Sequence, residues 1–484
     1  MAEREYDSHV ISFFDGLHED EFEKINMHGV KSVTEAAREV NVIREVDVVV
    51  VGGGPGGCAA AIESARAGAH TLLIERYGHL GGMATGGLVN IIPNLGTIYG
   101  EQCIGGFCQE FIDRLSARDA ATYPPKEAWG KPVEEIVDYY LDAMMGHFYV
   151  RTNPDGDQIP LYTAVIDPEV GKDELNTMVL ESGCELLLHS WVVAPIMEGN
   201  KMVGVIVESK AGREAVLAKI VIDSTGDGDL LPASGAEMDE YLAPLTRIAQ
   251  FGWVYWMCNV DLDKYNEFRD NDPDAHNEVL GKIAEAGGLP YFSKSVLANQ
   301  EGVVWQHRLI GSVHQTDPEE MTYIDVMARK TAVHTWELFK KNMPGFEKSI
   351  IMLSNPQLGL SGGRRVIGEY YLTGADMESD EPFEDTVAVF ADNDRGQNSL
   401  DHPKTYVPYR ALIPKGIDGF MVACRAISSD YEWQEFFNLI PHCMSFGHAA
   451  GIAAALAVQH GIEPRDVDYA ELKAKLLETG AILP

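Results

Sequence analysis

The sequence predicts an α/β fold around a mainly parallel sheet, and three features near its start indicate this class. Residues 46–51 (VDVVVV) form a short β-branched run that is typical of a buried strand. A glycine-rich segment follows at 52–57, and residues 58–67 are strong helix formers that end before Gly68. Residues 71–75 (TLLIE) predict a second strand, so these segments together form a βαβ unit.

Further elements follow in order along the chain. Apolar runs that alternate with turn residues, and one later run, predict strands at 185–193, 201–208, 214–217, 219–222 and 417–424. Helical patterns and one alanine-rich stretch predict helices at 272–287, 319–342 and 443–460. Aromatic residues at uneven spacing mark the region 241–355, which we therefore expect to form a separate body.

Composition and charge exclude several classes of function. The 484 residues are 45% hydrophobic and 23% charged, as expected of a globular chain with a large core. The 38 basic and 74 acidic residues give a net charge of −36, which argues against binding to nucleic acid or to anionic membranes. No run reaches the roughly 18 apolar residues of a membrane helix, and the charged N-terminus lacks a signal core. We therefore expect a cytoplasmic protein.

Seven scattered cysteines without C-x-x-C predict neither a disulfide framework nor a metal site.

The glycine-rich turn has the spacing of a dinucleotide-binding fingerprint. Gly52, Gly54 and Gly57 match G-x-G-x-x-G, and Glu75 stands at the end of the next strand. Gly52 permits the tight turn, Gly54 lets the backbone approach a pyrophosphate, and Gly57 lets helix and strand pack closely. The helix N-terminus offers N–H groups to phosphates, and the Glu75 carboxylate can accept hydrogen bonds from ribose hydroxyls. Because the unit occurs once and further glycine turns follow it, we expect FAD rather than NAD.

Six runs carry a resemblance to a known family. They are residues 48–57, 75–82, 222–229, 364–370, 407–413 and 447–457. On these runs the chain resembles the FAD-dependent oxidoreductase family, which is distantly similar to fumarate reductase and succinate dehydrogenase flavoproteins. The resemblance implies a glutathione-reductase-type FAD/NAD(P)-binding domain of the Rossmann kind, built from several segments, with an inserted α+β substrate or cap domain. The predicted parts are an N-terminal extension packed on the body (1–43), the first FAD-binding part with its β-meander (44–240), the substrate domain (241–405, with 356–370 returning to the flavin) and the last FAD-binding part (406–484).

The resemblance also implies contacts to FAD, residue by residue. Gly82 and Met83 lie beside the ribityl chain or the ring, and Val193 contacts adenine through its backbone. The helix at 443–460 directs its N-terminus at the flavin, where its partial positive charge stabilises the reduced anion. The expected contacts are Gly52, Gly54, Pro55, Gly57, Glu75, Arg76, Gly82, Met83, Val193, Thr225, Gly226, Asp227, Arg425 and Met444.

Flavin chemistry usually needs a proton acceptor or donor near the substrate, and His442 is the first candidate. It precedes the helix predicted at 443–460, whose positive end lowers the pKa of a histidine and favours the neutral imidazole. The alternative is a hydrogen-bonded core or capping histidine. Tyr409 can reach the flavin from the substrate side, whereas we expect surface or structural roles for His402 and His307.

Three other features admit a functional and a structural interpretation. Arg365, with its neighbour Arg364, can clamp a carboxylate or carbonyl group, or make a structural ion pair. His79 lies where the distantly similar dehydrogenases tether their flavin, but we expect a packing side chain and non-covalent FAD. Cys103 and Cys108 have the C-x₄-C spacing of disulfide reductases, but without a second nucleotide site we expect two unconnected thiols.

Together these features predict a flavoprotein dehydrogenase that moves a hydride between flavin N5 and a small organic substrate. Oxidation of a CH–OH group in a sugar-like or cyclic compound is the first choice. Reduction of an activated C=C bond is the second choice, and thiol–disulfide reduction is the third. A flavin-carrying subunit of a larger complex is the alternative from another class. The expected partners are the substrate and an electron acceptor that the sequence does not identify, and the sequence is compatible with a homo-oligomer.

Overall fold

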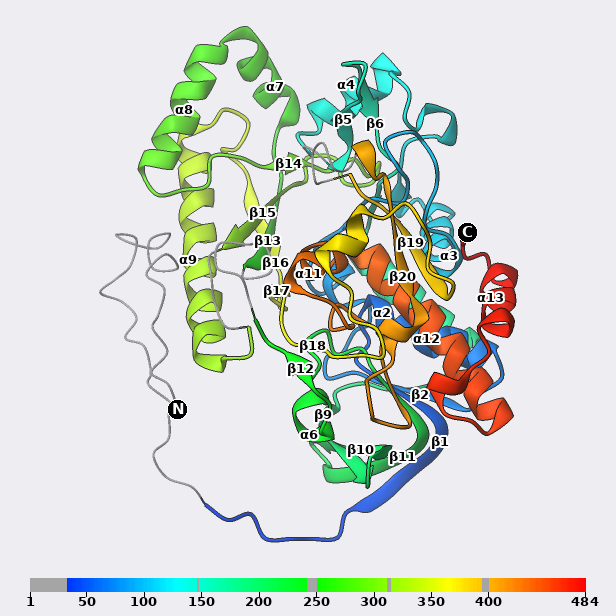
Figure 1. The fold of residues 1–484 in the computed structure, drawn as a ribbon. Coiled ribbons are helices and arrows are strands. Elements are labelled where there is room, and N and C mark those ends of the chain that lie inside the picture. The colour runs from blue at the N-terminus through cyan, green and yellow to red at the C-terminus, as the bar shows by residue number, and fades with distance from the viewer. Residues whose placement is uncertain (1–32, 146–147, 242–249, 311–314, 394–399) are drawn as a thin grey trace.

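The central sheet of the computed structural model combines strands from distant parts of the chain. The structure describes residues 33–145, 148–241, 250–310, 315–393 and 400–484 (Figure 1). The strand order is β8 (Glu185–Leu187), β2 (Thr71–Ile74), β1 (Asn41–Val51), β11 (Gly212–Asp223), β10 (Lys201–Ser209) and β9 (Trp191–Glu198), and β21 (Phe420–Val422) pairs with β11. All pairs are parallel except those that β10 makes with β11 and β9. The predicted α/β class is confirmed.

Strand β11 joins the two halves of this sheet. Its first six residues pair with β10, its last three pair with β21, and β1 runs along its other side. The two strand-like runs predicted at 214–217 and 219–222 are parts of this one strand. Lys219 interrupts the apolar pattern, but its side chain is exposed and its Nζ pairs with Asp47 at 2.7 Å, so the strand continues through it. Conversely, the predicted strand 185–193 contains two strands, β8 and β9.

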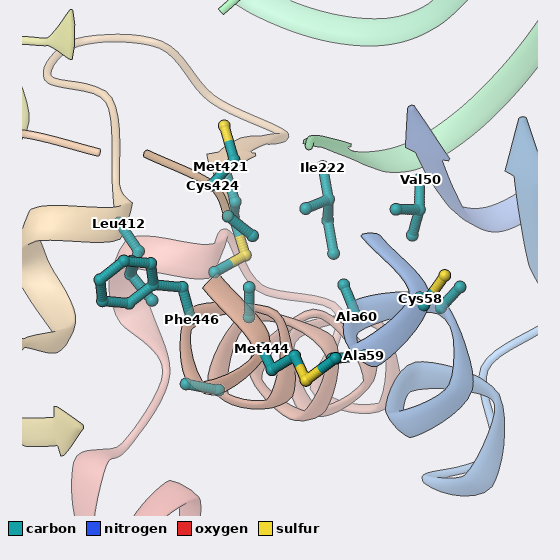
Figure 2. Packing of buried hydrophobic residues seen from close by; sticks show 14 of the residues in the cluster. Val50, Cys58, Ala59, Ala60, Ile222, Leu412, Met421, Cys424, Met444 and Phe446 are labelled. Atoms are coloured by element: carbon teal, nitrogen blue, oxygen red, sulfur yellow. The ribbon is translucent and has the colours of Figure 1, made fainter. Parts of the chain in front are cut away.

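Helices α2 (Pro55–Arg66) and α12 (Ile440–His460) cover one face of the parallel strands. In Figure 2, Val50 and Ile222 of the sheet lie over Ala60 of α2, with α12 directly beneath. A side chain on Gly447 or Gly451 would overlap the backbone of α2, so these glycines permit backbone-to-backbone contact. The alanine-rich run is therefore a core helix, although it begins at Ile440 rather than at 443.

Membrane-spanning potential is limited to one bent helix pair. Among the described residues, no single helix is long and apolar enough to cross a membrane. Helices α11 (Tyr431–Phe437) and α12 have the length and composition of a membrane span only when they are taken together, and the pair is bent by 97°.

A second sheet holds the aromatic segment. It consists of antiparallel strands in the order β14 (Ser293–Lys294), β15 (Val304–Ile310), β13 (Phe251–Cys258) and β16 (Ile350–Ser354), and β17 (Gly359–Leu360) also pairs with β13. Trp253, Tyr255 and Met257 pack on α9 (Pro318–Asn342), beside which stand α7 (Leu262–Asn271) and α8 (Pro273–Glu285) (Figure 1). Val254 and Trp256 face the other way and pack on α4 (Glu134–Asp142). The helices predicted at 272–287 and 319–342 are confirmed as α8 and α9.

The remaining elements are short. The helices are α3 (Gly106–Ser116), α5 (Pro168–Glu181), α6 (Leu231–Ser234) and α13 (Tyr469–Glu478), with 3₁₀ turns at Gly82–Ala84, Lys126–Ala128, Gly374–Glu378, Tyr409–Leu412 and Pro464–Asp466. The strands are β3 (Ile91–Ile92), β4 (Ala121–Thr122), β5 (Val150–Thr152), β6 (Gln158–Pro160), β7 (Ala164–Ile166), β12 (Met238–Asp239), β18 (Arg365–Val366), β19 (Thr386–Ala391) and β20 (Lys404–Pro408). Most of the predicted N-terminal extension, residues 1–32, lies outside the described residues. The first strand begins at Asn41, inside that predicted extension.

Candidate functional site

The turn between β1 and α2 forms one wall of an open cavity. Gly52 has a φ of +96°, and a side chain there would begin 2.5 Å from the carbonyl oxygen of Ser224. The space around Gly54 is open, so the backbone faces the cavity directly. Gly54 is also the N-cap of α2, and no side chain caps this end. Free N–H groups of the first turn can therefore bind a phosphate.

Most of the expected FAD contacts come together around this cavity. Its other walls are the ends of β2 and β11, the start of β9 and the loop after β21. The expected contacts that line it are Gly52, Gly54, Pro55, Glu75, Arg76, Gly82, Met83, Thr225, Gly226 and Arg425. The glycine cradle, the open helix end and the carboxylate of Glu75 provide the groups that a dinucleotide requires. These residues therefore fit FAD.

Glu75 is a buried carboxylate that two backbone groups hold at the cavity wall. The N–H of Gly53 donates to one oxygen at 2.6 Å, and the N–H of Tyr77 donates to the other at 2.8 Å. Burial raises the pKa of Glu75, although both hydrogen bonds favour the charged form. The guanidinium of the adjacent Arg76 lies over the rings of Tyr77 and Trp191, 4.9 and 5.4 Å from their centroids. The wall of the cavity that Glu75 forms thus has fixed side chains.

The opposite wall depends on a buried carboxylate at the end of β11. Asp223 accepts hydrogen bonds from the N–H and the hydroxyl of Thr225, at 2.9 and 2.7 Å, and from the N–H of Leu230 at 3.1 Å. These bonds hold the turn in place. Asp229 in the same turn lines the cavity, and burial together with the neighbouring Asp227 and Asp223 raises its pKa to about 7.

Four of the expected FAD contacts lie outside the cavity lining. Gly57 packs against the carbonyl of Gly52, as its predicted packing role requires. Asp227 forms an ion pair with Arg425, so it acts on the cavity through that arginine. Val193 is 43% exposed, and its neighbours at 190–192 line the cavity instead. Met444 is fully buried in the core (Figure 2).

A second cavity adjoins the first. It is mainly apolar and lies between the loop before β3, the second sheet and the start of α12. Its lining residues are Met83, Val89, Asn90, Ile91, Pro93, Phe148, Gly252, Trp305, His307, Gly359, Leu360, Ser361, Asn438, Leu439 and Ile440. Met83 lines both cavities. The turn after β2, which carries Met83, therefore lies between the two cavities.

The structure places His442 inside the core rather than at either cavity. Its ring stacks on Phe390, with centroids 3.9 Å apart, and its Nδ1 lies 3.0 Å from the carbonyl oxygen of Phe436. The prediction placed it just before the helix, but α12 includes it in the first turn. Pro441 did not mark the boundary, because a helix tolerates proline in its first turn. This position supports the alternative of a hydrogen-bonded core histidine.

Arg365 and Tyr409, the other two predicted catalytic residues, also lie away from the cavity linings. Arg365 is fully buried, pairs with Asp239 at 2.8 Å and donates to the Gln434 side chain at 2.6 Å. These contacts match the interpretation as a structural ion pair. The Tyr409 hydroxyl donates to the carbonyl oxygen of Pro464 at 2.7 Å, so it is engaged inside the core.

The remaining candidates have structural surroundings. His79 stacks on Tyr77, with ring centroids 5.4 Å apart, and lies outside the lining of the first cavity. Arg364 pairs with Glu240, and His402 pairs with Asp380. Within the described ranges, no group of three or more His, Cys, Asp and Glu residues is placed to hold a metal ion.

Cys103 and Cys108, which we expected to be two unconnected thiols, are both buried and free. Burial raises the pKa of each thiol. A thiol that stays protonated is a poor nucleophile, so this pair does not suit disulfide exchange.

The second cavity contains polar residues that sequence reasoning did not place there. Asn90, Trp305 and Asn438 stood in no motif, and we had expected a surface or structural role for His307. Trp305 belonged only to the aromatic region that we expected to form a separate body. These side chains come from three distant segments, so no local pattern could group them.

Comparisons with known proteins find curated relatives of part of this chain. Digeranylgeranylglycerophospholipid reductase 1 of Methanopyrus kandleri is 26% identical over 182 residues, which are 38% of this chain and 40% of the relative. Thiamine thiazole synthase of Methanococcus vannielii is 27% identical over 190 residues, 38% of this chain and 56% of the relative. The chain thus matches about two fifths to just over half of the length of these curated relatives.

Solved structures and a family model extend the comparison. The crystal structure of a geranylgeranyl bacteriochlorophyll reductase-like protein from Thermoplasma acidophilum is 16% identical, with a TM-score of 0.41, over 90% of this chain and 84% of that chain. The p-nitrophenol 4-monooxygenase of Pseudomonas putida is 11% identical, with a TM-score of 0.44, over 87% and 82%. The model described as FAD dependent oxidoreductase matches residues 47–476, nearly the whole described chain. This protein therefore belongs to the FAD dependent oxidoreductase family, and FAD is its cofactor.

Proposed function

We propose that this enzyme oxidises a CH–OH group of a neutral cyclic compound by hydride transfer to its FAD. The observation that carries the proposal is that Met83 lines both the FAD cavity and the apolar cavity. When bound, FAD supplies the acceptor of the hydride. A compound in the apolar cavity lies next to the cofactor and is enclosed by the second sheet and the start of α12.

His307 is the residue that we propose takes the hydroxyl proton. Its side chain lines the apolar cavity, and a proton acceptor must reach the substrate. Its Nε2 lies 3.1 Å from the point where a side chain on Gly252 would begin, so that glycine leaves room for the imidazole. The Tyr291 hydroxyl donates to the carbonyl oxygen of His307 at 2.9 Å and fixes the backbone beneath it.

The composition of the lining narrows the substrate class. Of the lining residues that the structure describes, none is a lysine, arginine, aspartate or glutamate. A dicarboxylate such as a fumarate-like substrate would therefore lack a counter-charge. A sugar would bring more hydroxyl groups than this mainly apolar wall can pair. These features favour a cyclic compound with few polar groups.

Reduction of a C=C bond is the second candidate, because two observations favour it. Curated relatives of part of this chain are named digeranylgeranylglycerophospholipid reductases. The apolar cavity would also accept an uncharged alkene. In that case the hydride moves from the reduced cofactor to the substrate, and His307 gives a proton instead of taking one.

Anaerobic mixing of the FAD-loaded enzyme with a panel of cyclic alcohols tests the proposal. A substrate bleaches the oxidised flavin, and His307→Gln slows bleaching by about 10²–10⁴-fold while FAD stays bound. His402→Gln is the control, since His402 pairs with Asp380 outside the apolar cavity. Bleaching by His307→Gln at the wild-type rate would remove His307 from the mechanism. If no alcohol bleaches the flavin but enones reoxidise the photoreduced enzyme, the reductase is the correct function. If neither reaction occurs in the FAD-loaded protein, a flavin-carrying subunit is the better interpretation.

A further inference from the structure

Three side chains around the apolar cavity have polar atoms without a hydrogen-bond partner among the described residues. Both amide atoms of Asn90, both amide atoms of Asn438 and the indole Nε1 of Trp305 are in this state. Asn90 is fully buried and Trp305 is 5% exposed. By contrast, the buried Asn355 donates to the carbonyl oxygen of Gln357 at 2.8 Å and accepts from the N–H of Val254. Asn90 and Asn438 differ from Asn355 in that neither amide atom of either side chain has a partner among the described residues.

Folding alone gives no reason to keep these groups here. Buried polar atoms are nearly always paired, because each loses its hydrogen bonds to water when it is buried. Asn90 lies before β3, Trp305 lies on β15 and Asn438 lies between α11 and α12, so three separate segments converge on one cavity. The backbone of Asn90 is fixed, since its carbonyl oxygen accepts from the N–H of Ile166 at 2.9 Å. A bound molecule can supply the missing partners.

We propose that Asn90, Asn438 and Trp305 determine substrate specificity by recognising an uncharged oxygen group on an otherwise apolar ring. This inference rests on the proposed function and identifies the substrate class. The amide and indole N–H groups can donate to a carbonyl or hydroxyl oxygen, and the amide oxygens can accept from a hydroxyl. The set therefore suits both members of a cyclic alcohol and ketone pair. It suits a carboxylate poorly, because no described lining residue is a lysine or arginine.

The first experiment titrates the FAD-loaded protein with three probes of similar size: acetophenone, ethylbenzene and benzoate. Calorimetry reports the affinity without any turnover. Acetophenone is expected to bind at least about tenfold more tightly than either other probe, which is the effect of one buried hydrogen bond. Equal affinity for the three probes, no binding of any probe, or a preference for benzoate would overturn the inference.

The second experiment removes the polar atoms one residue at a time. In Asn90→Leu and in Asn438→Leu, the preference for acetophenone over ethylbenzene is expected to fall to within about twofold, while ethylbenzene still binds. Trp305→Phe provides a third variant that keeps an aromatic wall but loses the indole N–H. Retention of the full preference in all three variants would overturn the inference.

Thermal denaturation without added probe distinguishes a recognition role from a structural role. Asn90→Leu removes unpaired polar atoms, so its melting temperature is expected to equal or exceed that of the wild type. Asn355→Leu is the matched control and is expected to melt lower, because it breaks existing hydrogen bonds. A lower melting temperature for Asn90→Leu, comparable to that of the control, would show that its amide serves the fold.

Different results would refute the proposed function and the recognition role of these three side chains. Selective binding of acetophenone without flavin bleaching by any alcohol would support the recognition set and contradict CH–OH oxidation. Flavin bleaching by cyclic alcohols, with unchanged selectivity in the leucine variants, would support the proposed function and overturn this inference.

Discussion

Asp229 is the residue through which pH is expected to control FAD binding. Its carboxyl group lines the FAD cavity, and burial raises its pKa to about 7, with further contributions from Asp227 and Asp223. Arg76 and Arg364 act in the opposite direction. The titration of Asp229 therefore falls in the neutral pH range.

The size of the effect follows from linkage between proton binding and FAD binding. FAD brings a pyrophosphate anion into the cavity, which disfavours the ionised carboxylate and raises the pKa of Asp229 further. If this repulsion is worth about 1.4 kcal/mol, the pKa rises from about 7 to roughly 8 on binding. Affinity is then greatest while Asp229 is protonated, below pH 7, and decreases as the pH rises through 7. The Kd for FAD is expected to be about sixfold higher at pH 8.5 than at pH 6.5.

Quenching of FAD fluorescence by the apoprotein at a series of pH values measures this dependence. Asp229→Asn is expected to remove most of it and to bind FAD at pH 8.5 about as tightly as the wild type does at pH 6.5. Glu198→Gln, at the exposed end of β9, is the control and keeps the wild-type dependence. A wild-type Kd that does not change with pH, or an unchanged slope in Asp229→Asn, would refute the reasoning.

Three further predictions concern the cofactor and the core. Burial lowers the pKa of His448 to about 4, so its contribution to stability is complete above pH 6.5 and is lost as the pH falls towards 4. When the pH is lowered from above 6.5 to 5, the free energy of unfolding measured with urea should therefore fall by about 2 kcal/mol less in His448→Gln than in the wild type. His460→Gln, at an exposed histidine, is the control. Acid precipitation should release all the FAD, since His79 lies outside the cavity lining; a yellow pellet would show a covalent bond. Gly447→Ala would place a methyl group against the carbonyl of Gly56, so FAD occupancy and melting temperature should both fall.

The part of the FAD site that could be predicted is the part that depends on local geometry. Gly52, Gly54 and Glu75 lie within one βαβ unit, where strand, turn and helix fix their relative positions over a short stretch of chain. Their spacing alone therefore placed them at the cavity. Val193 lies one residue beyond the stretch 190–192 that lines the cavity, because the start of β9 had to be inferred from the sequence.

The apolar cavity could not be predicted, because nothing local defines it. Trp305 and His307 point into it from an inner strand of the second sheet, whereas Asn90 lies more than two hundred residues earlier. A lone asparagine in a loop is ordinary, and a tryptophan in a strand is a normal core residue. Their importance lies in the missing hydrogen bonds, which become visible only when all the possible partners have been placed in space.

The position of His442 shows how a small error in a helix boundary changes a functional prediction. Residues of a helix follow one another at about 100°, so Ile440 and Cys443 share one side while His442 lies roughly opposite Ile440. In α12, Cys443 lines the FAD cavity and Ile440 lines the apolar cavity, so this side of the first turn faces both. His442 must then face the core, where it stacks on Phe390. A helix beginning at Cys443 would have left the imidazole free to turn towards the flavin. The three additional residues in the helix therefore turn the imidazole away from both cavities, which is why we propose His307, a lining residue of the apolar cavity, as the proton acceptor instead.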